Sequence, residues 1–245
     1  MPGAGASPPL EIDILRKIYR NADGRSVEAV RNLAFSIQPH SFVCLIGPSG
    51  CGKTTILRIL LGLDRDFEGC VRPDVGDLPV GVVFQEPRLL PWRTVEENVG
   101  LSLRSYGLAR TLDPLFAELD LEEWRHRYPG ELSLGMARRA ALARALAIEP
   151  DLLVLDEPFV SLDESGAAEL RAIVSRLAAR RRTTVILVTH NLREALGLAD
   201  RLILLTARPA SLLADIPLTT AREMRTDAWV EEGRRDLARR FAIDE

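Results

Sequence analysis

A short glycine-rich segment carries the residues whose types and spacing have the most specific chemistry. Residues 47–54 read GPSGCGKT, which fits G-x-x-x-x-G-K-[ST], the pattern of loops that cradle phosphate groups. Glycines let such a loop turn sharply and aim its backbone N–H groups inward, and the N-terminus of the following helix adds partial positive charge. We expect Lys53 to reach the β- and γ-phosphates of a nucleotide and the Thr54 hydroxyl to hold Mg²⁺. The residues predicted to bind the nucleotide here are Gly47, Pro48, Ser49, Gly50, Cys51, Gly52, Lys53, Thr54 and Thr55.

The segments on either side of this loop favour a ligand over the alternative, a glycine-rich turn that binds nothing. The apolar run 42–46 predicts a buried strand, and residues 55–61 have the apolar spacing of a helix. A strand, a loop and a helix in this order are the context that a phosphate-binding loop needs.

Two adjacent carboxylates end another apolar run. Residues 152–158 read LLVLDEP, and carboxylates at the end of a buried strand cost free energy unless a cation offsets them. Mg²⁺ is the natural partner of Asp156, directly or through water. Glu157 could polarise a water molecule for attack on a γ-phosphate. The alternative is an ordinary helix N-terminus with acidic residues.

Further polar residues stand where predicted strands end. Gln85 follows the run 80–84, His190 follows the run 185–189, and Asp163 lies just beyond the carboxylate pair. Ligands of open parallel sheets bind outside the carboxyl ends of the strands, so we expect Gln85, Asp156, Glu157 and His190 to gather with the phosphate loop at one edge. A purely structural histidine is the alternative for His190.

Ser133 precedes an alanine-rich helix and suits its N-cap. A helix N-terminus presents free N–H groups to an anion, although many ordinary helices begin in the same way.

The elements that must position these residues indicate an α/β fold with a mostly parallel sheet. Near-continuous apolar runs separated by helical stretches are typical of strands covered on both faces. Strands are predicted at 42–46, 80–84, 152–155, 185–189 and 202–205, and helices at 54–62, 134–148, 165–181 and 191–198. Residues 10–38 alternate like antiparallel strands with a turn at 21–24, and residues 86–150 read as an inserted helical subdomain.

Composition narrows the classes of function. The net charge is −3 over 245 residues, which gives no support to a nucleic-acid partner. The three cysteines have no metal-ligand spacing, and no apolar run reaches the ~18 residues of a membrane span. We predict a disordered leader at 1–9, a main domain at 10–215 and a charged helical tail at 216–245.

The motifs, taken in order over residues 10–215, resemble the nucleotide-binding subunit of an ATP-binding cassette (ABC) transporter. GPSGCGKTT is similar to its Walker A motif, VFQEPRLLPW to its Q-loop, LSLGMARRAALARAL to its signature, LLVLDEP to its Walker B motif, SLD to its D-loop and TH to its switch histidine. The resemblance implies a P-loop NTPase (RecA-like) core with an N-terminal antiparallel β subdomain and an inserted α-helical subdomain.

The resemblance also implies roles for single residues. Glu157, His190 and Gln85 would be catalytic, Tyr19 would stack on adenine, and Asp163 would be the D-loop aspartate. Mg²⁺ would be held by Thr54, Gln85 and Asp156. Ser133 and Gly135 would contact the ATP bound to the partner chain. Packing of Tyr19 in the core of its strand is the alternative for that residue.

The same resemblance implies a working assembly. Two copies of the chain would sandwich two ATP molecules and drive transmembrane permease subunits from the cytoplasmic face of the inner membrane, with a periplasmic solute-binding protein as an indirect partner. Residues 89–95, Met136 and residues 199–209 resemble the nitrate/sulfonate/taurine importer branch. Residues 86–100 are the expected docking surface for the permease, with a helical-subdomain core as the alternative.

One position departs from the family pattern. The signature of the family is LSGGQ or LSGGM, and this chain has Leu134 in place of the first glycine. Leu134 either weakens the contact with the γ-phosphate of the partner's ATP or packs in the partner interface. A degenerate cassette that only binds ATP, and a soluble ABC ATPase acting on DNA or ribosomes, are the competing functions. The single cassette and the lack of sustained heptads or a basic stripe disfavour the latter.

Overall fold

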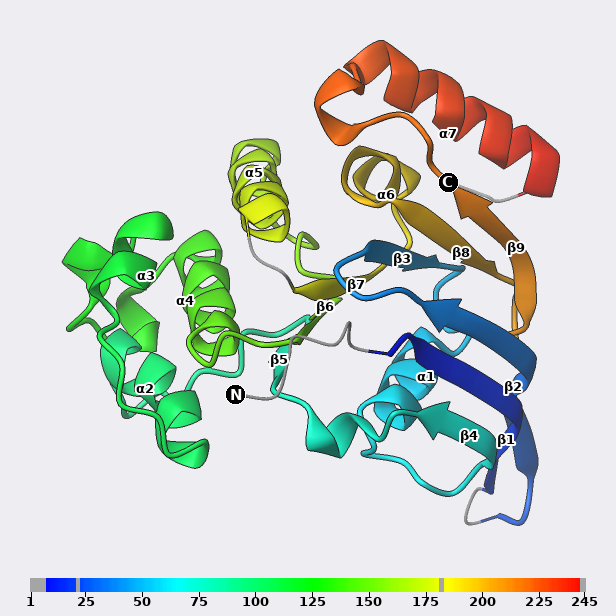
Figure 1. Ribbon diagram of the computed structural model, residues 1–245, viewed down its shortest axis with the longest axis horizontal. Coiled ribbons are helices and arrows are strands. Elements are labelled where there is room, and N and C mark those ends of the chain that lie inside the picture. The colour runs from blue at the N-terminus through cyan, green and yellow to red at the C-terminus, as the bar shows by residue number, and fades with distance from the viewer. Residues whose placement is uncertain (1–7, 21–22, 181–182, 243–245) are drawn as a thin grey trace. The chain divides into compact units, whose positions relative to one another are not determined.

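The chain forms two compact units, which divide after Asp77 and after Val185. A computed structural model describes residues 8–20, 23–180 and 183–242 (Figure 1). The first unit combines the N-terminal part with the segment from Ile186 onward, and the second is Leu78–Val185. Most of the predicted leader, and residues 21 and 22 of the predicted turn, lie outside the described residues.

An antiparallel sheet of order β2-β1-β4 begins the first unit. Strands β1 (Leu10–Arg20) and β2 (Ser26–Ile37) pair antiparallel, as the sequence predicts for residues 10–38. Strand β4 (Glu68–Arg72) pairs antiparallel with the other edge of β1 and is absent from the sequence prediction. Alternate residues of β1, among them Ile12 and Ile14, are buried, because successive side chains of a strand point to opposite faces.

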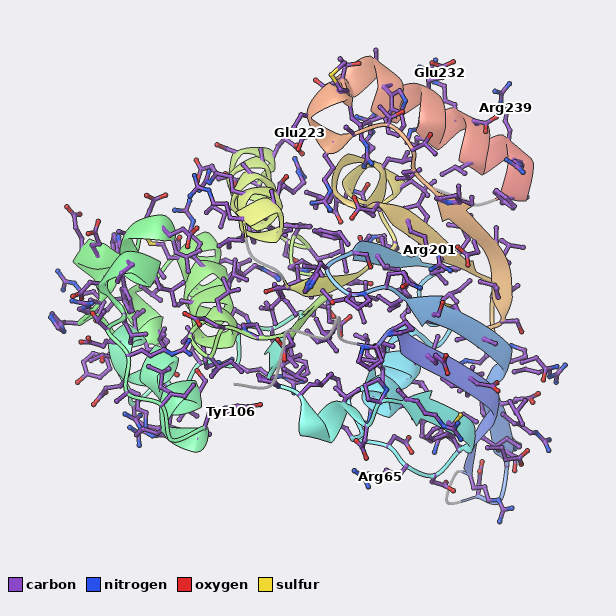
Figure 2. The ribbon with its side chains drawn as sticks, viewed as in Figure 1. Arg65, Tyr106, Arg201, Glu223, Glu232 and Arg239 are labelled. Carbon is purple, nitrogen blue, oxygen red and sulfur yellow. The ribbon has the colours of Figure 1, made fainter. Side chains whose placement is uncertain are left out.

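A second set of strands in the first unit carries the phosphate loop. Strand β3 (Phe42–Ile46) pairs parallel with β8 (Arg201–Leu205), and β8 pairs antiparallel with β9 (Leu212–Pro217). All five residues of β3 are buried. Arg201, labelled in Figure 2, links β8 to two other strands. Its guanidinium forms an ion pair with Asp215 on β9 and donates to the carbonyl oxygen of Ser36 on β2 at 2.7 Å.

Helices complete this unit. Helix α1 (Lys53–Leu60) follows β3, and α6 (Leu192–Leu198) packs against β3 and against α7 (Asp227–Phe241). Figure 1 shows α7, in red, beside α6. Helix α7 lies in the predicted charged tail, whereas β9 runs across residue 215, where the sequence places the end of the main domain.

The second unit combines a parallel strand pair with helices. Strand β5 (Val80–Val83) pairs parallel with β6 (Leu152–Asp156). Between them lie only helical elements and loops: α2 (Val95–Ser105), α3 (Asp113–Glu118) and α4 (Leu134–Leu146), and after β6 comes α5 (Glu164–Arg180). Helix α4 packs against α2, α5 and β5. Strand β7 (Thr184–Thr189) passes from this unit into the first.

Short 3₁₀ turns complete the secondary structure, at Val75–Asp77, Glu122–Trp124, Pro129–Glu131 and Arg222–Met224. The described residues contain no helix that combines the length and the apolar character needed to cross a membrane.

Candidate functional site

The phosphate loop occupies residues 47–52 between β3 and α1, as predicted. Its lysine is 6% exposed, and the Lys53 Nζ atom donates to the carbonyl oxygens of Gly47 at 2.8 Å and Pro48 at 3.1 Å. The loop therefore folds around an ammonium group. Pro48, Ser49 and Gly50 are exposed, as is Thr54, whereas Gly47 and Cys51 are buried.

Close packing leaves no room for side chains at two glycines of this loop. A Cβ atom at Gly47 would lie 2.8 Å from the Cys51 Sγ atom, and one at Gly52 would lie 2.9 Å from the Ala29 carbonyl oxygen. Gly52 also has φ of 130°, a conformation that L-residues rarely adopt. The backbone of the loop is consequently fixed, as a phosphate cradle requires.

The N-terminus of α1 fits an anion. Its N-cap is Gly52, no side chain caps it, and its first turn holds no acidic residue. The first backbone N–H groups of a helix lack carbonyl partners within the helix, and the helix dipole favours negative charge there, so this end suits an anion. Burial raises the pKa of the Cys51 thiol, so we assign this cysteine a packing role and no nucleophilic one.

Tyr19 stands in a polar cluster on the first unit. Its hydroxyl donates to the Asp64 Oδ2 atom at 3.0 Å, and the Lys17 ammonium lies 4.7 Å from its ring centroid. Lys17 is 3% exposed and also donates to Asp64 Oδ1 at 2.8 Å. The side chain is half-buried and its hydroxyl lies among charged groups, which is unlike the core packing considered as an alternative. Its stacking on adenine remains a prediction.

A network of hydrogen bonds holds the turn that presents His190. The buried Thr189 hydroxyl donates to Glu194 Oε2 at 2.6 Å and accepts from the Asn191 backbone N–H at 3.0 Å. The Asn191 side chain caps α6. Between these anchored residues the His190 side chain is exposed, as a residue that contacts a ligand has to be.

In the second unit the carboxylate pair lies at the end of β6. Asp156 is the last residue of the strand and Glu157 follows with φ of 46°. Both side chains are half-buried. Arg138 of α4 donates to the Glu157 carbonyl oxygen, a contact that no pattern in the sequence predicts.

The predicted signature and D-loop residues line one pocket. Ser133 is the N-cap of α4, as predicted, since its hydroxyl accepts from the Met136 backbone N–H at 3.3 Å. Ser133 and Gly135 share a cavity of about 420 Å³ with Leu162 and Asp163. Leu134 lines the same cavity and is 41% exposed. The structure thus brings signature and D-loop together around a space open to a ligand.

The segment after Gln85 is held firmly although its tip is exposed. Gln85 itself is exposed, and Arg144 of α4 donates to the carbonyl oxygens of Pro87 at 2.9 Å and Arg88 at 2.7 Å. Asn98, which is fully buried, donates to the Leu90, Arg93 and Thr94 carbonyl oxygens. Trp92 is nonetheless 69% exposed, so this aromatic side chain does not belong to a helical core.

The Mg²⁺ ligands predicted from sequence are chemically suitable. A hydroxyl, an amide and a carboxylate oxygen, from Thr54, Gln85 and Asp156, are ligands that Mg²⁺ accepts. Thr54 and Asp156 lie in different units, so the gathering of these residues with the phosphate loop remains a prediction.

Comparison with known proteins places these features in a family context. The model of the family described as "ABC transporter" matches residues 30–160. The aliphatic sulfonates import ATP-binding protein SsuB 2 of Burkholderia cenocepacia is 42% identical over 228 residues, 90% of this chain and 83% of its own length. SsuB 1 of Streptomyces avermitilis is 42% identical over 227 residues (93% and 85%), and SsuB of Bacillus subtilis is 39% identical over 206 residues (81% of each).

Two solved structures share the fold. The dimeric structure of MJ0796, described as a bacterial ABC transporter cassette, has a TM-score of 0.74 and 26% identity over 86% of this chain and all of that one. A post-hydrolysis state of the same cassette, bound to ADP and Pi, has a TM-score of 0.72 and 25% identity with the same coverage. These similarities, together with the strand pairs above, confirm the predicted P-loop NTPase fold.

Proposed function

Because the chain belongs to the ABC transporter family, we propose that it is the ATP-binding and ATP-hydrolysing subunit of an importer for aliphatic sulfonates or a related small solute such as taurine or nitrate. The observation that carries this proposal is the phosphate loop built around the buried Lys53. The names of the relatives, all import ATP-binding proteins for aliphatic sulfonates, support the class of cargo.

ATP binding is assigned to the first unit. Backbone N–H groups of the loop and of the α1 N-terminus would hold the phosphates, and Lys53 would exchange its carbonyl acceptors for phosphate oxygens. The adenine ring would lie on Tyr19, held by its hydrogen bond to Asp64.

Hydrolysis is assigned to side chains at strand ends. Glu157 would accept a proton from the attacking water molecule, Gln85 would help to position that water, and His190 would donate to the γ-phosphate. Mg²⁺, held by Thr54, Gln85 and Asp156, would neutralise charge on the phosphates.

The working unit is proposed to be a homodimer. The cavity lined by Ser133, Gly135 and Asp163 is open, and its lining includes the N-terminal end of α4. An anion suits such a helix end, so the γ-phosphate of ATP on a second copy is the proposed occupant. The dimeric MJ0796 cassette supports this arrangement.

The remaining partners follow from the role of an importer subunit. Trp92 and its neighbours Leu89, Leu90 and Pro91 would dock on the permease at the cytoplasmic face of the inner membrane, and a periplasmic solute-binding protein would deliver the cargo. An exposed aromatic residue on a rigid support is typical of a partner site.

A binding measurement tests the ATPase assignment. Lys53→Ala removes a charge-assisted contact worth roughly 1.5–3 kcal/mol, so calorimetry should show about a ten- to hundredfold weaker ATP affinity. Arg58→Ala, which removes an exposed cation from the same helix, is the matched control and should leave the affinity unchanged. Equal ATP affinity of Lys53→Ala and wild type would refute the assignment of the loop.

The cargo requires a transport measurement. The chain, reconstituted with its permease and solute-binding protein, should import an aliphatic sulfonate with ATP consumption. If the reconstituted transporter imports nitrate and no sulfonate, the cargo is nitrate and the assignment to aliphatic sulfonates is wrong.

A further inference from the structure

We propose that Arg138 is a positioning residue that ties helix α4 to the turn carrying Glu157 and thereby couples the two ATP sites of the dimer. This inference rests on the proposed function, because it needs two ATP sites that are completed by the α4 N-termini of opposite chains.

One guanidinium group holds both ends of the turn 157–160. The Arg138 Nη1 atom donates to the Glu157 carbonyl oxygen at 3.4 Å and its Nη2 atom donates to the Val160 carbonyl oxygen at 2.5 Å. The turn is also closed by the Val160 backbone N–H, which lies 3.4 Å from the Glu157 carbonyl oxygen. Two donors in a fixed planar fork match two carbonyl oxygens three residues apart.

The backbone of this turn needs such support. Glu157 has φ of 46° and Ser161 has φ of 64°, so left-handed residues stand at its start and just beyond its end. Residues other than glycine persist in this region only where the surrounding structure fixes them. Arg138 supplies two of the fixing contacts at the residue proposed to activate water.

An arginine at this position is otherwise costly. Arg138 is 3% exposed, and burial lowers the pKa of its guanidinium. Its Nε atom has no hydrogen-bond partner within the described part of the chain. The two acceptors named above are neutral carbonyl groups. A buried cation loses hydration free energy that neutral acceptors only partly replace. An apolar side chain would fill the same space without that cost, so the hydrogen bonds to the turn are the specific contribution of arginine.

The same helix begins at the signature. Ser133 is the N-cap of α4, and Arg138 lies five residues further along. The residues that follow the turn, Leu162 and Asp163, line the cavity with Ser133 and Gly135. Helix α4 therefore faces this loop across the cavity at its N-terminus and is hydrogen-bonded to the turn 157–160 through Arg138.

Within the proposed dimer, the signature residues at the start of α4 and the turn of Glu157 act on different ATP molecules. Ser133 and Gly135 would contact the nucleotide of the partner, whereas Glu157 would act on the nucleotide of its own chain. A shift of α4 on engagement of the partner's nucleotide would pull on the turn of Glu157 through Arg138. Coupling of this kind appears as cooperativity in ATP hydrolysis and not in the intrinsic affinity of one chain for ATP.

The test compares variants of the full-length chain in ATP titrations of hydrolysis. In Arg138→Met we expect the Hill coefficient to fall from about 2 toward 1 and kcat to fall about tenfold, within the usual range of site-to-site coupling. The ATP dissociation constant of the chain should stay within about twofold of wild type, because Arg138 donates its hydrogen bonds to Glu157 and Val160 and not to the phosphate loop. Arg138→Lys keeps the charge but replaces the planar fork with a single ammonium nitrogen, so this variant should be intermediate.

A matched control separates loss of coupling from the effect of replacing any arginine of this unit by methionine. Arg125 lies in the same unit, is 25% exposed, and pairs with Asp113 away from the turn. Arg125→Met should leave the Hill coefficient and kcat unchanged.

Several results would overturn the inference. The first is a folded Arg138→Met variant with wild-type kcat and Hill coefficient. The second is a parallel fall of ATP affinity, kcat and melting temperature in Arg138→Met, which would mark a purely structural role. The third is non-cooperative ATP hydrolysis by the wild-type chain. If Arg138→Met does not fold, wild-type kcat and Hill coefficient in Arg138→Lys would overturn it. Failure of the proposed function looks different, since the wild-type chain would then neither bind nor hydrolyse ATP.

Discussion

Leu134 offers the sharpest test, because it replaces a signature glycine and its side chain is still 41% exposed. We favour the interpretation in which Leu134 packs against the partner chain, since the rest of the motif set is intact. Leu134 and Leu162 both line the signature cavity, so an apolar side chain of the partner chain would find apolar surface there. On this interpretation Leu134→Gly weakens the ATP-bound dimer and lowers turnover.

The size of the effect follows from the exposed fraction. Complete burial of a leucine side chain is worth about 2 kcal/mol, so covering the remaining two-fifths is worth about 0.8 kcal/mol. A two-fold dimer contains the contact twice, which gives about 1.6 kcal/mol, or roughly a fifteenfold change in the dimer dissociation constant. The glycine also costs the first turn of α4 at most about 1 kcal/mol of folding stability, which a thermal melt would register separately.

The assay uses two backgrounds. Dimer affinity is measured by sedimentation with ATP in the Glu157→Gln background, where the nucleotide should persist, and turnover is measured in the wild-type background. Leu63→Gly is the matched control, since Leu63 is 61% exposed and lies outside the signature cavity. A tighter dimer together with higher turnover in Leu134→Gly would refute packing and identify Leu134 as an obstruction at the γ-phosphate.

Four further predictions test the rest of the site. Glu157→Gln should abolish steady-state hydrolysis and accumulate ATP-bound dimer because the base for water is lost, and near-normal phosphate release would reject Glu157 as that base. His190→Ala should bind ADP normally but hydrolyse ATP poorly; equal losses of ADP and ATP affinity in calorimetry would make the histidine structural. Trp92→Ala should keep basal ATPase activity but lose stimulation by the permease, whereas unchanged stimulation by the permease would contradict the docking role of Trp92. Burial would lower the pKa of Lys17 and raise that of Asp64, but their mutual hydrogen bond and opposite charges outweigh burial, so the Lys17 pKa is raised and the Asp64 pKa is lowered. The stability that this pair contributes should therefore be lost as pH falls through the lowered Asp64 pKa or rises through the raised Lys17 pKa. Unfolding curves of Lys17→Met that keep the wild-type pH dependence would contradict this.

Local patterns in the sequence were sufficient for the core elements. The apolar runs predicted β3, β5, β6, β7 and β8 to within a residue at each end, because a strand buried on both faces needs an unbroken apolar run. The phosphate loop was equally local, since its glycines, its lysine and its helix are consecutive. The N-cap Ser133 was also predicted, because capping depends on a side chain and a backbone group only three residues apart.

Elements that depend on distant partners were missed. Strands β4 and β9 are only half-buried, and their residues gave no apolar run. Strand β4 is defined by pairing with β1, whose residues lie more than 50 positions earlier in the chain, and no local pattern encodes such a partner. The exposure of Trp92 was likewise undecided, because it depends on how Asn98 holds the segment before α2.

The sequence by itself determined the family, the phosphate loop and the order of the chemical groups, because these depend on residue types at short spacing. Only the tertiary structure decided which of those groups touch. Arg138 is one arginine among several in an alanine-rich helix, and its contacts with Glu157 and Val160 span 19 and 22 residues. Tyr19 and Asp64 are 45 residues apart. Such contacts arise from packing between elements whose spacing along the chain carries no periodic signal, so the positions of these side chains became known only with the fold.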